Sequence, residues 1–360
     1  MKLSAAVVLI LLATLCATQE ESGTTTSWTS TLVDQEAAGD DLEVTDSGSG
    51  ASDVDKDSEY QWIMHFKSGV LHVANSEEVK ELTKYIEKQS EDYRSGITLV
   101  SQAPTQLEDG PTEVVDDKDK RPNSPPLGAS QRPDVVGQNL EEVESTNFYP
   151  QYAVGILENN CTAFLIGQRH ALTTASCVYD YDSGYWSGDL DFWRGRNGDQ
   201  YLEKMLWEHV TIPAKFFVTG DHIHNWALIT FTDHAGSRSP VWLKMAHSQK
   251  VHDIVMTVYG YLPDDRPWGT MYSSVCRSDH TQEDTKSLAI QCGSDQKFSG
   301  GPILKGYNFK RSKMPLVYGI SIAYDYSFAH KAVNFHLDLF WSLCHLMQKE
   351  GFDARCGPEQ

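Results

Sequence analysis

Three short segments of this chain carry side chains that could take part in hydrolysis. The first, from Cys161 to Val178, reads CTAFLIGQRHALTTASCV, the second, from Asn225 to Phe231, reads NWALITF, and the third, from Phe298 to Leu304, reads FSGGPIL. The third segment offers the hydroxyl of Ser299. A serine hydroxyl is a poor nucleophile unless a neighbouring base takes its proton, so the chemistry depends on whether such a base is present.

The order and spacing of these segments resemble those of the trypsin/chymotrypsin family of serine proteases, over about residues 146–360. The resemblance implies that Ser299 stands at the nucleophile position, Ser176 in place of the basic histidine, and Asn225 in place of the orienting aspartate. A hydroxyl cannot accept a proton at neutral pH, and an amide cannot stabilise an imidazolium. Changing the orienting aspartate to asparagine alone lowers catalysis by about 10⁴-fold in this family. We therefore expect a protein that is catalytically inactive.

The same resemblance implies an altered oxyanion hole and activation switch. The hole would be formed at Lys297 and Ser299, and Lys297 replaces the glycine that usually lies two residues before the nucleophile. A side chain there can disfavour the backbone conformation that presents the N–H donor. Phe298 replaces the aspartate that holds a new N-terminus after activating cleavage.

Within the family, the chain resembles the secreted group of serine proteases 23 and 35. The segment GYLPDDRPWG at 260–269, the tail LCHLMQKEGFDARCG at 343–357 and a long acidic region before the domain carry this resemblance. It implies an extracellular protein that acts by binding a protein partner, such as a protease, an inhibitor or a matrix component. The alternative is an active serine endopeptidase that uses Ser299 with a non-standard base.

Three histidines are candidates for that non-standard base. His170, His222 and His224 lie nearest in sequence to the altered positions, and Asp221 could pair with His222. We give more weight to surface or structural roles, because a rebuilt dyad needs both the right geometry and the right pKa. A zinc site from Asp221, His222 and His224 lacks an evident fourth ligand, so we expect neither metal nor cofactor.

The elements expected to position these residues are mostly strands. After residue 150, short apolar runs of strand length alternate with turn residues, which is typical of an antiparallel barrel or sandwich. The fold class expected is all-β, a double antiparallel β-barrel of the trypsin type with a C-terminal helix, preceded by an acidic, mostly disordered region. Asp338 could cap the helix and Gly351 could end it.

The first 145 residues differ in composition. A charged and then apolar start predicts a signal peptide over 1–17, and the Ser/Thr-rich acidic composition of 18–59 predicts disorder. Residues 60–95 suggest a small strand–helix element of a pro-segment, in which Asn75 caps the helix with Glu78 as reciprocal partner. The alternative is a lone amphipathic helix in a disordered region. Residues 96–145 read as a Pro/acid-rich linker, and 146–360 as the trypsin-like domain.

Charge and cysteines limit the compartment and the partners. Residues 19–148 hold 28 acidic and 10 basic residues, so this half should repel nucleic acid and anionic membranes. It could instead bind calcium or a basic matrix. Six cysteines remain after the signal peptide; they allow 15 pairings, and the simplest joins sequence neighbours: Cys161–Cys177, Cys276–Cys292 and Cys344–Cys356. We expect a secreted monomer.

Two further features bear on the surface. Asn160-Cys161-Thr162 is an N-glycosylation sequon that adjoins a disulfide cysteine. Three tryptophans, Trp186, Trp193 and Trp207, flank an insertion between the first two motifs, and we expect them to pack rather than to form a binding face.

Overall fold

Two β-sheets make up most of the computed structural model, which describes residues 54–55, 58–91, 93, 98–102, 140–235, 242–247, 254–262, 267–278, 286–292, 298–305, 315–322, 330–351 and 355–358. The chain divides into two units, residues 1–32 and 33–360, and every described residue belongs to the second. The expected signal peptide, most of the expected disordered region, residues 103–139 and Lys297 lie outside the described residues.

The first sheet has nine strands, which carry the first two sequence motifs. Their order is β11 (Glu203–Met205), β10 (Phe192–Arg194), β5 (Val154–Leu157), β6 (Thr162–Leu165), β7 (His170–Thr173), β13 (Ala227–Phe231), β12 (Trp207–Pro213), β1 (Trp62–Phe66) and β2 (Leu71–Val73). β5, β6, β7 and β13 are buried along their whole length. Strands buried on both faces read as continuous apolar runs rather than as an alternating pattern, which is the pattern of these motifs.

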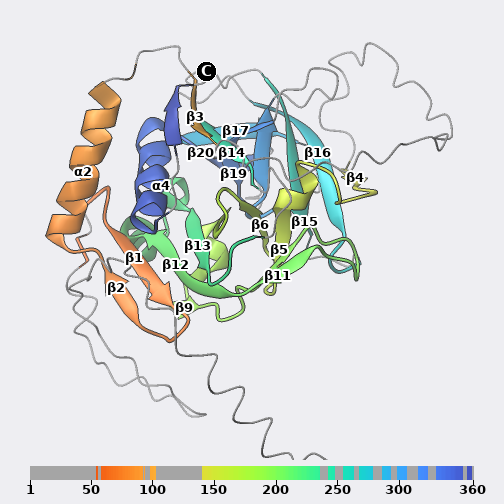
Figure 1. The fold of residues 1–360 in the computed structure, drawn as a ribbon, viewed down its shortest axis with the longest axis horizontal. Coiled ribbons are helices and arrows are strands. Elements are labelled where there is room, and N and C mark those ends of the chain that lie inside the picture. Colours follow the sequence, from red (N-terminus) through yellow and green to blue (C-terminus); the bar gives the residue numbers. More distant parts are fainter. Residues whose placement is uncertain are drawn as a thin grey trace, which may run out of the picture. The chain divides into compact units, whose positions relative to one another are not determined.

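The second sheet closes into a six-stranded barrel (Figure 1). Its ring consists of β18 (Pro302–Lys305), β15 (Val255–Tyr261), β16 (Met271–Ser278), β17 (Ser287–Gln291), β20 (His330–Asn334) and β19 (Leu316–Ser321), and the pairing of β18 with β19 completes it. Three more strands continue from β19: β14 (Lys244–His247), β3 (Leu99–Gln102) and β21 (Arg355–Pro358). β14 runs parallel to β19. The expected all-β class with a C-terminal helix is confirmed.

The remaining elements are short or helical. β8 (Tyr179–Asp180) pairs with β9 (Tyr185–Trp186). Within the described ranges, the helices are α2 (Ser76–Glu91), α3 (Ala214–Thr219) and α4 (Leu337–Lys349), and 3₁₀ turns occur at Gln151–Ala153, Ala175–Cys177 and His222–His224. Among the described residues, no helix is long and apolar enough to cross a membrane.

The strand–helix element near the N-terminus is built into the domain that follows it. β1 pairs with β12 over five residues, from Trp62 opposite Pro213 to Phe66 opposite His209. Trp62 is 2% exposed, and α2 (orange) lies against α4 (blue) in Figure 1. As expected, Asn75 caps α2: its Oδ1 accepts from the N–H of Glu78 at 3.1 Å, and Glu78 Oε2 accepts from the N–H of Asn75 at 2.9 Å.

Both ends of the expected linker are strands. β3, at residues 99–102, pairs with β14 on one side and with β21 on the other. β4 (Leu140–Glu142) pairs with β16. Both strands are short and contain few apolar residues. The sequence did not predict them because the residues between them are rich in proline and acidic side chains.

The C-terminal helix begins two residues earlier than expected. His336, not Asp338, caps α4, because its Nδ1 accepts from the N–H of Leu339 at 3.3 Å. Asp338 lies in the first turn, where its carboxylate accepts from the hydroxyl of Tyr60 at 3.2 Å. After the helix, Gly351 adopts φ +81°, the left-handed conformation that favours glycine at this position.

Candidate active site

Three turns at the ends of strands hold the residues singled out in the sequence. Ser176 lies in the turn directly after β7, Asn225 directly before β13, and Ser299 directly before β18. Gly300 fixes the last turn: its φ is +83°, and a Cβ there would lie 2.0 Å from Thr162 O. Thr162 N also donates to Ser299 O at 3.0 Å. The serine is therefore held against β6 by a turn that only glycine can complete.

The structure brings the three residues into one chain of hydrogen bonds. Asn225 Oδ1 accepts from Ser176 N at 2.8 Å, and Asn225 Nδ2 donates to Ser176 Oγ at 3.2 Å. Ser176 Oγ donates to Thr174 Oγ1 at 3.3 Å, and Thr174 Oγ1 lies 3.0 Å from Ser299 Oγ. Thr174 is the member that sequence reasoning missed. The signal for it was its position two residues before Ser176.

The direction of these hydrogen bonds follows from Asn225. Because Oδ1 accepts from a backbone N–H, the amide nitrogen must face Ser176 and donate to it. The Ser176 hydroxyl is then free to donate only towards Thr174. Asn225 thus supplies a proton donor where a working triad has a carboxylate that accepts.

Among the described residues, Ser299 Oγ has one other neighbour within hydrogen-bonding range. Cys177 Sγ lies 3.4 Å from it, and this sulfur belongs to a disulfide with Cys161. A disulfide sulfur is a weak acceptor and is not a base at neutral pH. The other two disulfides also join sequence neighbours, Cys276–Cys292 and Cys344–Cys356.

The three candidate histidines have other partners. His170 Nε2 lies 2.9 Å from Glu350 Oε2. His222 Nδ1 and His224 Nδ1 lie 3.7 Å and 3.3 Å from the two carboxylate oxygens of Asp221. Burial lowers the pKa of His224. Within the described part of the chain, no group of three His, Cys, Asp or Glu side chains is placed to hold a metal ion.

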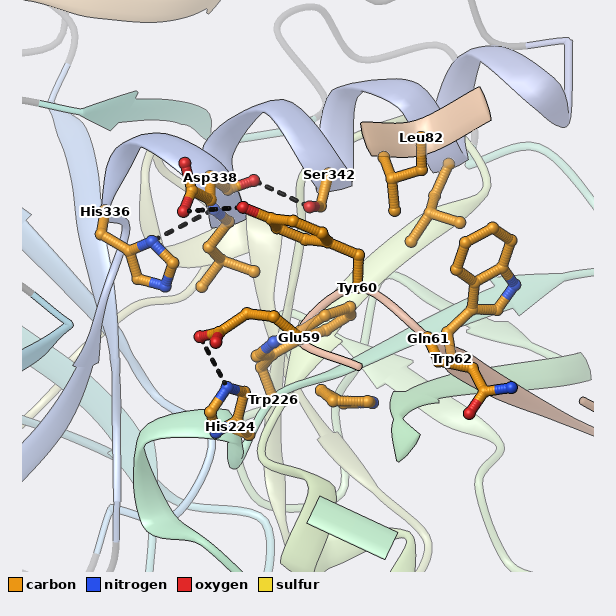
Figure 2. A pocket seen from close by; sticks show the side chains of 13 residues that line it. Glu59, Tyr60, Gln61, Trp62, Leu82, His224, Trp226, His336, Asp338 and Ser342 are labelled. Atoms are coloured by element: carbon orange, nitrogen blue, oxygen red, sulfur yellow. Dashed lines mark hydrogen bonds and ion pairs between the residues drawn. The ribbon is translucent and has the colours of Figure 1, made fainter. Parts of the chain in front are cut away.

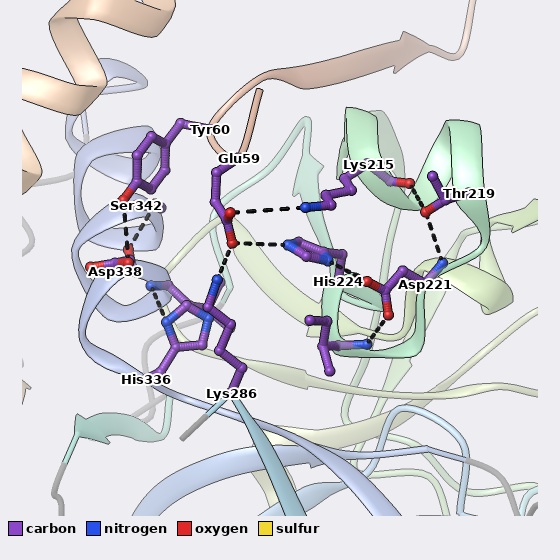
Figure 3. A network of polar contacts seen from close by, with 12 residues as sticks. Glu59, Tyr60, Lys215, Thr219, Asp221, His224, Lys286, His336, Asp338 and Ser342 are labelled. Atoms are coloured by element: carbon purple, nitrogen blue, oxygen red, sulfur yellow. Dashed lines mark hydrogen bonds and ion pairs between the residues drawn. The ribbon is translucent and has the colours of Figure 1, made fainter. Parts of the chain in front are cut away.

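His224 also lines a cavity, which lies where residues 59–62 meet α4 (Figure 2). Its lining side chains are Glu59, Tyr60, Gln61, Trp62, Leu82, Pro213, His224, Trp226, His336, Asp338, Leu339, Ser342 and Leu346. Glu59 is the centre of the polar contacts here (Figure 3): its carboxylate binds Lys286, Lys215 at 3.9 Å and His224 at 3.6 Å. The hydrogen bond from Lys286 lowers the pKa of Glu59.

A surface groove begins at Ser176 and follows the turn and the β8–β9 hairpin. The residues that line it are Ser176, Cys177, Val178, Tyr179, Asp180, Tyr185, Ser187, Gly188 and Asp189. Tyr185 is 70% exposed. Of the three tryptophans near this insertion, Trp207 is buried and Trp186 stacks on His65 at 4.6 Å between ring centroids.

Phe298, before the serine, belongs to the core of the second barrel. It is buried, and a Cβ on Gly260 would lie 2.5 Å from its ring. A charged side chain at this position would lose its hydration without a partner in an apolar site. Lys297, the expected oxyanion-hole position, lies outside the described residues.

Comparisons with known proteins agree with this architecture. No family model matches the chain. A glutamyl endopeptidase of Bacillus licheniformis is 23% identical over 142 residues, which are 38% of this chain and 45% of that protein. The chain therefore spans less than half the length of the curated relative it matches.

Two solved structures are similar to this chain. A Glu endopeptidase crystallised with MPD superposes with a TM-score of 0.50 at 18% identity, covering 59% of this chain and 100% of that one. A thermostable serine protease from an extremophilic microorganism gives a TM-score of 0.46 at 15% identity, covering 55% and 97%. The chain has the fold of the trypsin-like serine proteases.

Proposed function

We propose that this chain is an exported serine protease homologue that does not cleave peptides and that acts by binding a protein partner. One observation carries the proposal: the Ser299 hydroxyl contacts another hydroxyl and a disulfide sulfur. In the trypsin-like fold, an imidazole would accept its proton. Resemblance to the serine protease 23 and 35 group and the three disulfides, which persist in oxidising compartments, support the extracellular location.

The size of the catalytic defect follows from known triads. Loss of the orienting carboxylate costs about 10⁴-fold, and loss of the base costs on the order of 10⁶-fold in kcat. The two losses are not additive, since both residues act as one unit. What remains would be stabilisation by backbone donors and by substrate binding, which is too weak for a working protease.

A fluorophosphonate probe tests this directly. The probe forms a bond to an activated serine Oγ and displaces fluoride. We expect the full chain to stay unlabelled, like its Ser299→Ala variant, while an active trypsin-like protease in the same tube reacts. If the chain is labelled and Ser299→Ala abolishes the labelling, the alternative is favoured: an active endopeptidase with a non-standard base. The similarity to a glutamyl endopeptidase supports that alternative.

Restoring the two missing groups tests the cause. In the double variant Ser176→His, Asn225→Asp, the new carboxylate can keep the 2.8 Å bond from the backbone N–H at position 176 and orient the imidazole. We expect labelling of Ser299 to rise at least 10²-fold over the wild-type chain. Ser176→His alone is the matched control, and it should gain less because its amide neighbour cannot stabilise the imidazolium.

The partner would meet the groove that begins at Ser176. Tyr185 and the acidic side chains of Asp180 and Asp189 line it, so a partner segment with basic and apolar residues fits its chemistry. We propose a monomer that binds neither nucleic acid nor membrane. If the acidic N-terminal region instead binds calcium, titration of the full chain with millimolar calcium should show binding that is lost when residues 18–59 are deleted.

A further inference from the structure

The sequon residue Asn160 lies close to the candidate active site. It precedes Cys161, whose disulfide partner contacts Ser299 Oγ, and it lies two residues before Thr162, whose N–H donates to Ser299 O. Two residues span at most about 7 Å. Asn160 is exposed, with φ +70° in a tight turn, a conformation that asparagine tolerates better than most residues.

The side chain of Asn160 is held in one orientation. Trp268 Nε1 donates to Asn160 Oδ1, so the amide oxygen faces the indole and Nδ2 is directed away from it. An N-linked glycan is attached through Nδ2 and leaves Oδ1 as an acceptor. The hydrogen bond is therefore compatible with the modified side chain.

Trp268 itself is a rigid, half-exposed aromatic surface. The guanidinium of Arg196 lies over its ring, 3.5 Å from the centroid. Arg196 is fixed in turn, because its Nε donates to Gly198 O at 2.8 Å and its side chain also lies 4.8 Å from the Trp193 ring. Trp268 remains 47% exposed with one face covered.

We propose that Asn160 carries an N-linked glycan whose first N-acetylglucosamine packs on the uncovered face of Trp268. The glycan then stands at the edge of the candidate site, beside the Cys161–Cys177 disulfide. The chemistry is a stack of sugar C–H groups on the indole face opposite the Arg196 guanidinium. The proposal rests on the export proposed above, because glycosylation requires the secretory pathway.

The timing of the modification follows from Thr162. This sequon hydroxyl is buried and accepts from the N–H of Tyr261 at 2.8 Å. A transferase needs an accessible sequon, so the glycan must be attached before β6 folds and before Cys161 forms its disulfide. Slowing disulfide formation with a mild reductant during synthesis should increase occupancy of Asn160.

The chain suits a clean test, because Asn160-Cys161-Thr162 is its single N-x-S/T sequon. The full chain would be expressed in eukaryotic cells that make only oligomannose glycans, and the medium would be examined by intact mass and peptide mapping. A secreted chain without a glycan at Asn160 overturns this proposal alone. A chain that is retained in the cytosol without a glycan overturns export as well.

Packing on Trp268 is tested by trimming. Endoglycosidase H leaves the first sugar, and peptide N-glycosidase removes it and converts Asn160 to Asp. We expect the melting temperature to hold after the first treatment and to fall by about 2–4 °C after the second. In Trp268→Ala, peptide N-glycosidase should lower the melting temperature only by the amount that the change of Asn160 to Asp causes. Trp268→Phe should show the same fall as the wild type.

The control substitution is Phe148→Ala, which removes another exposed aromatic side chain, 67% exposed. This variant should show the same difference in melting temperature between the two enzyme treatments as the wild type. An equal loss of stability on complete deglycosylation in the wild type and in Trp268→Ala would show that the sugar does not contact the indole.

Discussion

At the scale of single residues, four polar side chains form one chain of hydrogen bonds. Asn225 accepts from the backbone N–H of Ser176, and Ser299 ends the chain through Thr174. None of these groups titrates near neutral pH. Asn225 contacts Ser176 twice, by accepting from its backbone N–H and by donating to its hydroxyl.

A buried cluster of ionisable side chains surrounds Glu350, at the end of α4. Its carboxylate accepts from His170 Nε2 at 2.9 Å, His209 Nε2 at 3.0 Å and Thr230 Oγ1 at 2.8 Å. Burial by itself raises the pKa of Glu350, but the hydrogen bonds from the two histidines outweigh burial and hold this pKa well below its ordinary value of 4.5.

Glu350→Gln should therefore lower the free energy of unfolding at pH 7 by about 1–3 kcal/mol. A depressed carboxylate pKa contributes stability above the unfolded value, and this stability is lost as pH falls below about 4.5. Urea unfolding between pH 7 and 3.5 measures both effects. The difference between wild type and variant should shrink below pH 4.5, and a constant difference would contradict this account. Glu208→Gln, which changes a half-exposed carboxylate, is the control.

At the scale of elements, the start of α4 depends on a neutral histidine. His336 Nδ1 accepts from the N–H of Leu339, which the protonated ring cannot do. Burial lowers the pKa of His336 from 6.5 to about 3. The unfolded chain therefore binds a proton here that the folded chain does not bind.

His336→Asn should weaken the dependence of stability on pH between 6.5 and 3. Asparagine caps helices well and does not titrate. In the wild type, the free energy of unfolding falls as pH drops below 6.5, because protonation then favours the unfolded state. We expect a smaller fall in the variant, measured by urea midpoints at pH 7 and 5. His222→Asn, at an exposed turn, should leave the slope unchanged.

The sequence predicted some elements well and others poorly, for physical reasons. Asn75 and Glu78 mark the start of α2 because a capping box is a local pattern, four residues long. The pairing of β1 with β12 joins residues about 150 apart, and local periodicity carries no information on such a partner. Asp338 looked like the better cap because histidine caps helices less often; the choice of His336 depends on the backbone just before α4. Thr174 was overlooked because the family motif draws attention to position 176.

At the scale of the whole molecule, the N-terminal segment joins the two sheets. β1 extends the first sheet, and β3 lies between two strands of the second. Glu59 binds Lys215 in α3 and Lys286, the residue directly before β17. The strand–helix element predicted over residues 60–95 is therefore packed into the same fold as the residues that follow it.

Cleavage within residues 103–139 should therefore leave both products associated. A chain with one inserted recognition sequence there would be cut to completion and passed through size exclusion. We expect one peak that holds both fragments at neutral pH, and two peaks in denaturant. Separation without denaturant would show that the pairings of β1 and β3 are too weak to hold the segment. An uncut sample is the reference.

The position of β3 also constrains how the protein can be made. β3 is synthesised early, yet one of its neighbours is β21, residues 355–358, which leaves the ribosome after all the other strands. Until then the backbone groups on that side of β3 have no strand to pair with. Pairings between such distant segments form slowly and expose unpaired edges meanwhile. Biogenesis of this protein should therefore be more sensitive to loss of chaperones than that of a fold assembled from neighbours in the chain.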